Sequence, residues 1–317
     1  MRFLVAGAGS WGTAFAHVLL ERDHDVVLGC HTDEQARAIA ETGRNPRYLP
    51  QVDLGRARPV TLDAAPADVD VVVVAVPSTA FAEVVAALPG EAPVLSLTKG
   101  LDPATGERLS TRVRDRPVAV LSGPNMAEEI AVGMPTAAVI ASEDGYLAGR
   151  LQHAINSGVF RAYVNQDVVG VELCAAAKNV IALAAGGVDG LALGDNSKAA
   201  LITRGLAEMA RLGEAAGARP ETFAGLAGMG DLIVTCWSRH GRNRHAGELI
   251  AQGRSPEAAV AEIGQTVEGL TTAPVLRDLS HRLDVELPIT ESVCAVLSGQ
   301  SLTVLISRLM GRQPTEE

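Results

Sequence analysis

The sequence contains few aromatic residues and very few lysines. Aromatic residues make up 3% of the 317 positions, so a buried core has to be built from aliphatic side chains and alanine. The 27 basic residues are 24 arginines and three lysines, Lys99, Lys178 and Lys198. Arginine stays protonated, whereas lysine exchanges a proton when its surroundings lower its pKa. The few lysines are therefore candidates for chemistry that arginine does not perform.

Cysteines are also scarce, and they lie far apart. The chain has four of them: Cys30, Cys174, Cys236 and Cys294. No two form a C-x-x-C pair, which argues against a zinc ribbon or a disulfide framework and fits a reducing compartment. We therefore expect a cytoplasmic protein without a bound metal. No uninterrupted apolar run reaches the roughly 18 residues of a membrane-spanning helix, and the first residues lack the layout of a signal peptide, so we expect no stable membrane insertion.

Positive charge is in deficit along the whole chain. The 37 acidic residues outnumber the 27 basic ones, which gives a formal net charge of −10. A protein this acidic is a poor general binder of nucleic acids and of anionic membranes. An anionic ligand therefore needs a local basic site.

A glycine-rich segment follows the first predicted strand. Residues 2–6 predict a short apolar strand, which leads into Gly7-Ala8-Gly9-Ser10-Trp11-Gly12, a helix to about residue 22 and a second strand over 25–30. This order of strand, GxGxxG, helix and strand is the context of the dinucleotide-binding fingerprint. In it, Gly7 allows the tight turn, Gly9 lets the backbone approach the pyrophosphate, and Gly12 lets the helix pack against the strand. The helix N-terminus then faces the phosphates.

The residues after the second strand bear on the choice of cofactor. An acidic side chain at that place binds the ribose 2′-hydroxyl and repels a 2′-phosphate. Gly29, Cys30, His31 and Thr32 provide no acid there, and His31 and Thr32 can meet a phosphate. We therefore expect NADP to be used and NAD to be possible as well, with Asp33 as the cap of the next helix.

Apolar runs continue the α/β pattern to about residue 165. They predict strands over 71–76, 94–97, 118–121, 136–141 and 159–164, and helices over 79–88, from about 126 and over 145–156. Ligands of open α/β sheets bind beyond the carboxyl ends of the strands. Lys99 and residues 122–125 both follow such ends, so we expect them to face a ligand.

Strand signals fade after about residue 165. Residues 167–185 predict a helix that is apolar on almost all sides and therefore buried, and Lys178 lies in its middle. A buried lysine is costly unless it faces a partner or a ligand, which favours a functional role over that of a lysine reaching the surface. We expect Gly186-Gly187 to end this helix, a loop over 190–196, and a second long helix over 197–216 in which Lys198 is structural.

Two short segments carry the remaining polar candidates. A tight glycine-rich turn is expected over 225–231, ending in Asp231, and Gly241-Arg242-Asn243-Arg244-His245 opens a further helix. Arginine at a helix N-terminus beside a glycine is suited to a phosphate monoester. Further helices are expected over 267–283, 286–298 and 302–310.

The predicted fold class is α/β with two domains. A Rossmann-type, mostly parallel sheet domain over 1–165 binds the dinucleotide. An all-α domain over 166–317 binds the substrate. The length of the chain fits two domains.

Several segments together resemble the bacterial NAD(P)-dependent glycerol-3-phosphate dehydrogenases. Related β-hydroxyacid dehydrogenases share the first segment but not the set, which runs in order along nearly the whole chain: 7–14, 96–100, 122–125, 177–180, 194–200, 230–232 and 238–244. The resemblance implies NAD(P)H-dependent reduction of dihydroxyacetone phosphate to sn-glycerol 3-phosphate, which feeds phospholipid synthesis. We also expect a homodimer with no partner other than its small phosphorylated substrate.

The resemblance further implies roles for individual residues. Lys178 is implied to be the catalytic acid/base, and Lys99 to contact both substrate and cofactor. The substrate is implied to contact Lys178 together with Gly123, Asn125, Asp231, Gly241, Arg242 and Asn243. The cofactor is implied to contact Ser10, Trp11, His31, Ala127, Arg242, Thr266 and Glu268, beside Gly7, Gly9, Gly12 and Thr32 from the sequence pattern.

The residue types fit this chemistry without the family name. Hydride transfer to a ketone leaves negative charge on its oxygen, and a lysine whose pKa is lowered by desolvation can donate a proton there. Three alternatives stay open: a related dehydrogenase acting on a non-phosphorylated hydroxy acid, a non-catalytic NAD(P)-binding sensor, and a structural interaction module. A phosphate-dependent KM, catalytic turnover and nucleotide binding distinguish them.

Overall fold

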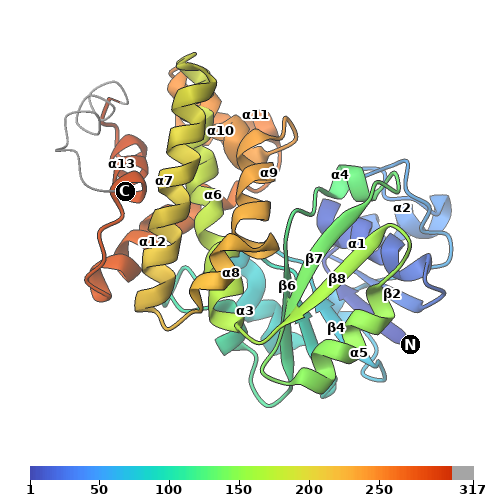
Figure 1. Ribbon diagram of the computed structural model, residues 1–317. Coiled ribbons are helices and arrows are strands. Elements are labelled where there is room, and N and C mark those ends of the chain that lie inside the picture. The colour runs from blue at the N-terminus through green and yellow to red at the C-terminus, as the bar shows by residue number, and fades with distance from the viewer. Residues whose placement is uncertain (302–317) are drawn as a thin grey trace.

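A sheet half and a helical half follow one another along the chain. The computed structural model describes residues 1–301, so the helix expected over 302–310 lies outside the described residues. Figure 1 shows the sheet with its covering helices on one side of the molecule and the helical half on the other. The last strand ends at Asn165, and the first long helix of the helical half begins at Val168.

The described residues contain one eight-stranded sheet with the order β3-β2-β1-β4-β5-β6-β7-β8. Neighbouring strands are parallel except β6 and β7, which are antiparallel. The strands are β1 (Arg2–Ala6), β2 (Asp25–Cys30), β3 (Arg58–Thr61), β4 (Val71–Val74), β5 (Val94–Ser96), β6 (Val118–Ser122), β7 (Thr136–Ala141) and β8 (Phe160–Asn165). The prediction of a mostly parallel sheet is therefore confirmed, although β3 was not predicted from the sequence.

Helices cover both faces of the sheet, as the near-continuous apolar strands require. Phe3 and Val5 of β1 pack with side chains of α1 and α5, whereas Leu4 points to the opposite face and packs with Phe81 of α3. The helices of this half are α1 (Ser10–Leu20), α2 (Asp33–Thr42), α3 (Ser78–Ala87), α4 (Ala127–Ile130) and α5 (Gly145–Ile155).

The strand order reverses direction beside β1. The chain builds β1, β2 and β3 towards one edge and then returns to place β4 on the other side of β1. In open α/β sheets the ligand binds at such a switch point, beyond the carboxyl ends of the strands. The loops after β1, β4, β5 and β6 meet at that edge.

The helical half is built around α6 (Val168–Gly190). This helix has the length and apolar composition to cross a membrane, but 89% of its most apolar window is buried inside the protein. It is therefore the core helix of this half. Around it lie α7 (Gly194–Ala215), α8 (Pro220–Ala224), a π-helical turn η3 (Leu226–Gly230), α9 (Asp231–Trp237), α10 (Arg242–Ala251), α11 (Pro256–Ile263), α12 (Glu268–Arg282) and α13 (Pro288–Leu297).

The expectation that Gly186-Gly187 ends the first long helix is wrong, because α6 continues to Gly190. The glycines serve helix packing instead. A Cβ on Gly186 would lie 1.8 Å from the Arg244 carbonyl oxygen of α10, and one on Gly247 would lie 1.9 Å from the Leu183 carbonyl oxygen of α6. The two backbones thus touch at a crossing that only glycine permits.

Three smaller expectations are also corrected. The loop expected over 190–196 is shorter, because α7 already begins at Gly194. The expected turn over 225–231 is the π-helical η3 followed by α9, and its Gly228 packs against the backbone of Phe223 rather than making a tight turn. The cap of α2 is Thr32, whose side chain accepts a hydrogen bond from the Gln35 amide, and not Asp33.

Candidate active site

The glycine-rich loop joins β1 to α1 at the switch point. Gly7 has φ +116°, and a Cβ there would lie 2.5 Å from the Ala75 carbonyl oxygen. A Cβ on Gly12 would lie 1.8 Å from the Gly7 carbonyl oxygen, so α1 packs directly on the turn. Around Gly9, by contrast, a Cβ would find nothing within 4 Å. Gly7 and Gly12 are needed for packing, while Gly9 faces open space.

The start of α1 fits the pyrophosphate of a dinucleotide. Gly9 is its N-cap and provides no side-chain hydrogen bond to the first turn, so the amide groups there stay available to an anion. The neighbouring Trp11 has a buried indole Nε1 without a hydrogen-bond partner among the described residues. Ser10 and Trp11 are therefore placed as the sequence predicts, on the first turn of the helix.

The end of β2 lies beside this loop. His31 is exposed, and its amide donates to Gln35 Oε1 over 3.3 Å. Thr32 caps α2 with its Oγ1 as a hydrogen-bond acceptor, so its hydroxyl group can still donate a hydrogen bond. Neither the His31 side chain nor the Thr32 hydroxyl proton is used in these bonds.

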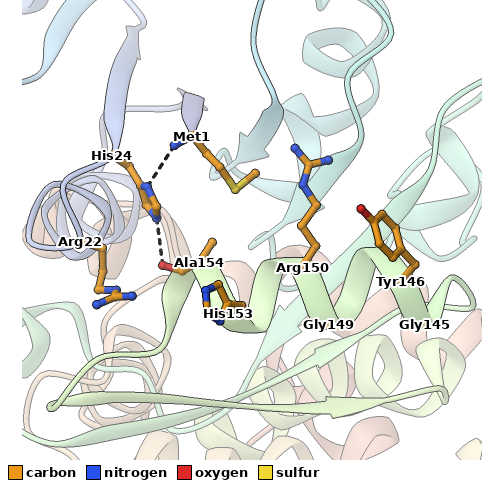
Figure 2. Close-up of a pocket in the computed structure, with 9 residues that line it drawn as sticks. All are labelled: Met1, Arg22, His24, Gly145, Tyr146, Gly149, Arg150, His153 and Ala154. Atoms are coloured by element: carbon orange, nitrogen blue, oxygen red, sulfur yellow. Dashed lines mark hydrogen bonds between the residues drawn. The ribbon is translucent and has the colours of Figure 1, made fainter.

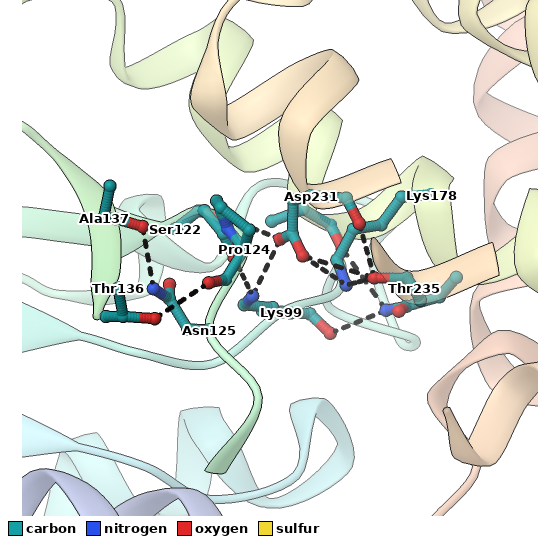
Figure 3. Close-up of polar contacts among 12 residues, drawn as sticks. Lys99, Ser122, Pro124, Asn125, Thr136, Ala137, Lys178, Asp231 and Thr235 are labelled. Carbon is teal, nitrogen blue, oxygen red and sulfur yellow. Dashed lines mark hydrogen bonds and ion pairs between the residues drawn. The ribbon is translucent and has the colours of Figure 1, made fainter. Parts of the chain in front are cut away.

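Lys99 and Asp231 bring the two halves together (Figure 3). The Lys99 Nζ donates to Asp231 Oδ2 over 2.7 Å and to the Gly123 carbonyl oxygen over 3.1 Å. Ser122 Oγ donates to the same carboxylate over 3.2 Å. Lys99 follows β5, Ser122 ends β6, and Asp231 begins α9, so this contact ties the carboxyl edge of the sheet to the helical half.

Lys178 lies on the other side of Asp231. Its Nζ donates to Thr235 Oγ1 over 2.7 Å and lies 3.1 Å from Asp231 Oδ1. Burial lowers the pKa of Lys178 to about 8, although Asp231 opposes the shift. Of the three ammonium protons, these two partners use two. The third remains for a ligand oxygen.

Asp231 is held ionised between the two lysines. Burial alone would raise the pKa of its carboxyl group, but Lys178 and Lys99 together bring that pKa below its usual value. Two ammonium groups against one carboxylate leave the cluster with an excess of positive charge. It is therefore suited to an anionic ligand, or to an oxygen on which negative charge develops.

A chain of amides links this cluster to α10. Asn179 Nδ2 donates to the Lys99 carbonyl oxygen over 3.4 Å, and Asn243 Nδ2 donates to Asn179 Oδ1 over 2.9 Å. The Gly269 amide in turn donates to Asn243 Oδ1. Asn179 thus bridges Asn243, at the start of α10, to the backbone of Lys99.

The other predicted residues of the helical half form a second group. Gly241 caps α10, where a Cβ would lie 2.8 Å from the Thr235 carbonyl oxygen. The exposed Arg242 donates to the Thr266 carbonyl oxygen over 3.0 Å. Glu268 accepts hydrogen bonds from the amide and the hydroxyl of Ser78, at the start of α3. Burial raises the pKa of Glu268.

Asn125 and Ala127 lie in the loop and short helix after β6. Asn125 Nδ2 donates to the Ala137 carbonyl oxygen over 3.0 Å. Its Oδ1 is buried and has no partner in the part of the chain that the structure describes, which leaves an acceptor for a ligand hydroxyl. Ala127 begins α4 and is buried against the sheet half.

Sequence reasoning placed Ser122 among the residues facing a ligand, but it left Thr235, Asn179 and Ser78 out of the candidate site. The position of Thr235, four residues after Asp231 on a helix, puts both on one face and is a signal that the sequence contains. Asn179 directly follows Lys178. The contact of Ser78 with Glu268 joins residues 190 positions apart and has no local signal. Lys198 lies outside this site, in a pair with Asp189, and no group of three or more potential metal ligands is found among the described residues.

A separate cavity lies away from these residues (Figure 2). It has a volume of about 580 Å³ and is lined by Met1, Arg22, His24, Gly145, Tyr146, Gly149, Arg150, His153 and Ala154. These residues lie at the start of β1, in the turn after α1 and on α5. None of them belongs to the predicted site.

Comparison with known proteins gives consistent results over the full chain. The model of the NAD-dependent glycerol-3-phosphate dehydrogenase N-terminus matches residues 3–148, and that of its C-terminus matches residues 167–304. The glycerol-3-phosphate dehydrogenase (NAD(P)+) of Pelotomaculum thermopropionicum is 46% identical, over 99% of this chain and 94% of that protein. The enzyme of the same name from Chlorobium phaeobacteroides is 42% identical, over 100% and 99%. The crystal structure of glycerol-3-phosphate dehydrogenase from Coxiella burnetii superposes with a TM-score of 0.94 at 36% identity, covering 98% of this chain and 99% of that one.

Proposed function

The chain belongs to the NAD-dependent glycerol-3-phosphate dehydrogenase family, and from this premise we propose how its residues carry out the reaction. The protein is an NAD(P)-dependent oxidoreductase that reduces dihydroxyacetone phosphate to sn-glycerol 3-phosphate. The observation that carries the assignment of residues is the Lys178–Asp231–Lys99 cluster at the carboxyl edge of the sheet.

The cofactor supplies the hydride, and the protein positions it. The amides at the start of α1, together with Ser10 and Trp11, hold the pyrophosphate. His31 and Thr32 meet the ribose end, where the lack of an acid favours NADP and still admits NAD. Ala127, Thr266 and Glu268 complete the contacts to the cofactor.

Lys178 is the acid/base of the reaction. Its ammonium group donates a proton to the substrate oxygen as negative charge develops there, and takes it back in the reverse direction. Its pKa of about 8 places this exchange near working pH. Asp231 and Thr235 orient the ammonium group, and Lys99 adds positive charge beside the same oxygen.

Arg242 and Asn243 hold the substrate phosphate at the start of α10. A phosphate fixed there sets the ketone at a constant distance from Lys178. Gly123, Asn125 and Gly241 line the remaining space, and the buried Asn125 Oδ1 accepts a hydrogen bond from a substrate hydroxyl. These roles favour a phosphorylated substrate over a simple hydroxy acid.

The test is an absorbance assay of reduced nicotinamide with dihydroxyacetone phosphate. Turnover with NADPH at least equal to that with NADH is expected. Dihydroxyacetone, which lacks the phosphate, is the matched control. Its KM should be much higher than that of dihydroxyacetone phosphate. Strict use of NADH contradicts the role of His31 and Thr32, and equal KM for both ketones contradicts that of Arg242.

A homodimer, a cytoplasmic location and a place before phospholipid synthesis complete the proposal. Met229, Ile233 and Trp237 are 41%, 47% and 50% exposed, and they recur every fourth residue along η3 and α9. Such an exposed apolar row is typical of a surface that another protein covers, and here a second copy is the occupant. The four cysteines are free thiols, which suits the cytoplasm, and light scattering should give twice the mass of the chain.

A further inference from the structure

We propose that Asn45 and Gln35 are positioning residues for the cofactor, because their side-chain amides fix the direction of the Ala8–Gly9 peptide. Neither residue belongs to the glycine-rich segment. The inference rests on the proposed function, since it concerns how the dinucleotide is held. Both residues act through this peptide and lie outside the set predicted to contact the cofactor.

Both amides converge on one carbonyl group. Gln35 Nε2 donates to the Ala8 carbonyl oxygen over 2.8 Å, and Asn45 Nδ2 donates to it over 2.9 Å. Asn45 is fully buried and also donates to Thr13 Oγ1 over 2.9 Å. Its Oδ1 accepts a hydrogen bond from the Tyr48 backbone N–H. The side-chain NH₂ group of Asn45, and not its oxygen, therefore faces Ala8.

The geometry of a trans peptide turns this anchor into a direction for a donor. The C=O of Ala8 and the N–H of Gly9 belong to one planar unit and point in opposite directions. With the oxygen held inside the protein, the Gly9 N–H points outward. It donates to no group in the described residues, and Gly9 borders open space. This is the direction that a pyrophosphate oxygen requires.

Without the two amides, the peptide could rotate. The Ala8 oxygen would then face the site, and a carbonyl dipole aimed at the phosphates opposes binding of an anion. A buried oxygen without donors is also costly. The pair therefore both stabilises the loop and sets its electrostatic direction.

Gln35 has a second connection that reaches the other end of the cofactor site. Its side-chain Oε1 accepts a hydrogen bond from the backbone amide of His31 over 3.3 Å, and its backbone amide donates to Thr32 Oγ1. The half-buried Gln35 side chain thus joins the pyrophosphate loop to His31, and the Gln35 backbone amide adds a bond to Thr32, the second residue proposed for the 2′-phosphate. A change at Gln35 should therefore affect NADPH more than NADH, whereas a change at Asn45 should affect both equally.

The experiment measures cofactor dissociation constants by fluorescence titration of the full chain. Gln35→Met removes one donor and keeps the length of the side chain. We expect its Kd for NADPH to rise about three- to tenfold, as for the loss of one hydrogen bond, with a smaller rise for NADH. Asn45→Asp is nearly isosteric and replaces the two donated hydrogen bonds by a carboxylate, so Kd should rise about tenfold or more for both cofactors.

Gln152→Met is the matched control. Gln152 Nε2 donates to the Ala162 carbonyl oxygen over 2.9 Å, which is the same kind of bond in the same half of the chain but on α5. This variant should lose thermal stability like Gln35→Met and keep its Kd for both cofactors. The control variant should also retain kcat and KM for dihydroxyacetone phosphate at saturating NADPH.

The outcomes separate the inference from the function on which it rests. If Gln35→Met and Gln152→Met both lower Tm while both keep the Kd of the unaltered protein, the amides are structural only and the inference is overturned. If Asn45→Asp does not fold, Gln35→Met alone decides. Failure of the unaltered protein to bind either cofactor would instead contradict the proposed function.

Discussion

At the scale of single residues, the proposed site depends on a lysine whose burial makes the charged form costly. Lys178 is 5% exposed in α6, the buried core helix of the helical half. It keeps a charge there because Thr235 accepts a hydrogen bond from its ammonium group and Asp231 pairs with it. Arginine cannot take this part, since its guanidinium group stays protonated. The acid/base role therefore explains why a lysine, and not an arginine, is kept at this buried position in a chain whose basic residues are mostly arginine.

Replacement of Lys178 tests the acid/base role directly. Lys178→Ala and Lys178→Arg should both lower kcat, by the ~10²–10⁴-fold that general acid–base catalysis contributes, while the Kd for NADPH stays nearly unchanged. Lys198→Arg is the control, because Lys198 pairs with Asp189 outside the site and an arginine can replace it there. Steady-state kinetics and fluorescence titration give both quantities. Near-normal kcat in Lys178→Arg would show that only the charge is needed.

The lowered pKa of Lys178 predicts opposite pH profiles for the two directions. Reduction of the ketone needs the ammonium form, so its kcat should fall as pH rises through about 8. Oxidation needs the neutral amine, so its kcat should rise through the same pH. Asp231 raises the pKa of Lys178, and Asp231→Asn should move both midpoints to lower pH. Parallel profiles in the two directions would exclude Lys178 as the titrating group.

Arg242 provides a test of the phosphate site. Arg242→Ala should raise KM for dihydroxyacetone phosphate by an amount equivalent to about 1.5–3 kcal/mol, the usual contribution of a hydrogen bond to a charged group. Arg239→Ala removes the same charge from an exposed position three residues earlier and should leave KM within about twofold of the unaltered protein. If both variants raise KM equally, the effect is one of general charge and the phosphate is held elsewhere.

At the scale of helices and strands, elements with strong local patterns were predicted well. The strands β1, β2 and β7 have the predicted limits, because the apolar runs of buried parallel strands are bounded by polar residues or glycine. The position of Lys178 within a buried helix followed from the small apolar residues around it. Lys99 follows a strand at the carboxyl edge of the sheet, as its sequence context indicated.

Features that depend on distant contacts were predicted poorly. Gly186-Gly187 has the composition of a helix end, but the glycines allow α10 to approach, and no local pattern reveals a helix that lies about 60 positions later. Gly228 likewise serves packing on Phe223. The Ser78–Glu268 contact joins two halves of the chain. In each case the deciding partner is remote in sequence, so neither periodicity nor propensity indicates it.

The crossing of α6 and α10 gives a prediction at this scale. Gly186→Ala puts a Cβ 1.8 Å from a backbone oxygen, so the helices must separate, at a cost of about 1–3 kcal/mol or more in the free energy of unfolding. Since α10 carries Arg242 and Asn243, KM for dihydroxyacetone phosphate should rise as well. Thermal denaturation and kinetics measure the two effects.

Gly149→Ala is the matched control for the crossing. Gly149 lies inside α5, and a Cβ there has nothing within 4 Å. Alanine is the better helix former, so this variant should gain about 0.5–1 kcal/mol. A loss of stability in Gly149→Ala equal to that in Gly186→Ala would refute the packing explanation.

At the scale of the whole molecule, three carboxylates of the helical half join it to the sheet half: the buried Asp231 and Glu172 and the half-buried Glu268. Asp231 accepts hydrogen bonds from Lys99 and Ser122. Glu268 accepts hydrogen bonds from the backbone amide and the hydroxyl of Ser78. Glu172 of α6 accepts the Ser110 amide over 2.8 Å and also binds the Ser110 hydroxyl and Arg108. Each acid comes from the helices, and the donors come from loops, strand ends or helix starts of the sheet half. The proposed active site therefore lies at a junction that also holds the protein together.

This junction predicts stability changes of opposite sign on acidification. Burial raises the pKa of Glu172 despite its partners, so the folded state takes up its proton at a higher pH than the unfolded chain. That contribution to stability is complete below the ordinary value of 4.5 and is lost as pH rises through the folded pKa. Glu172→Gln does not titrate, so its Tm should fall further behind that of the unaltered protein at about pH 5 than at about pH 7.5.

For Asp231 the pKa is lowered, so the stability that its charge provides is present above 3.8 and is lost as pH falls through the folded pKa. The Tm deficit of Asp231→Asn should therefore shrink as pH falls below 3.8, whereas that of Glu172→Gln should already have grown at about pH 5. Calorimetry of the two variants from about pH 7.5 down to about pH 3 compares them directly. Deficits that change with pH in the same direction would mean that one of the two carboxylates titrates as an ordinary surface group, which its burial at the junction opposes.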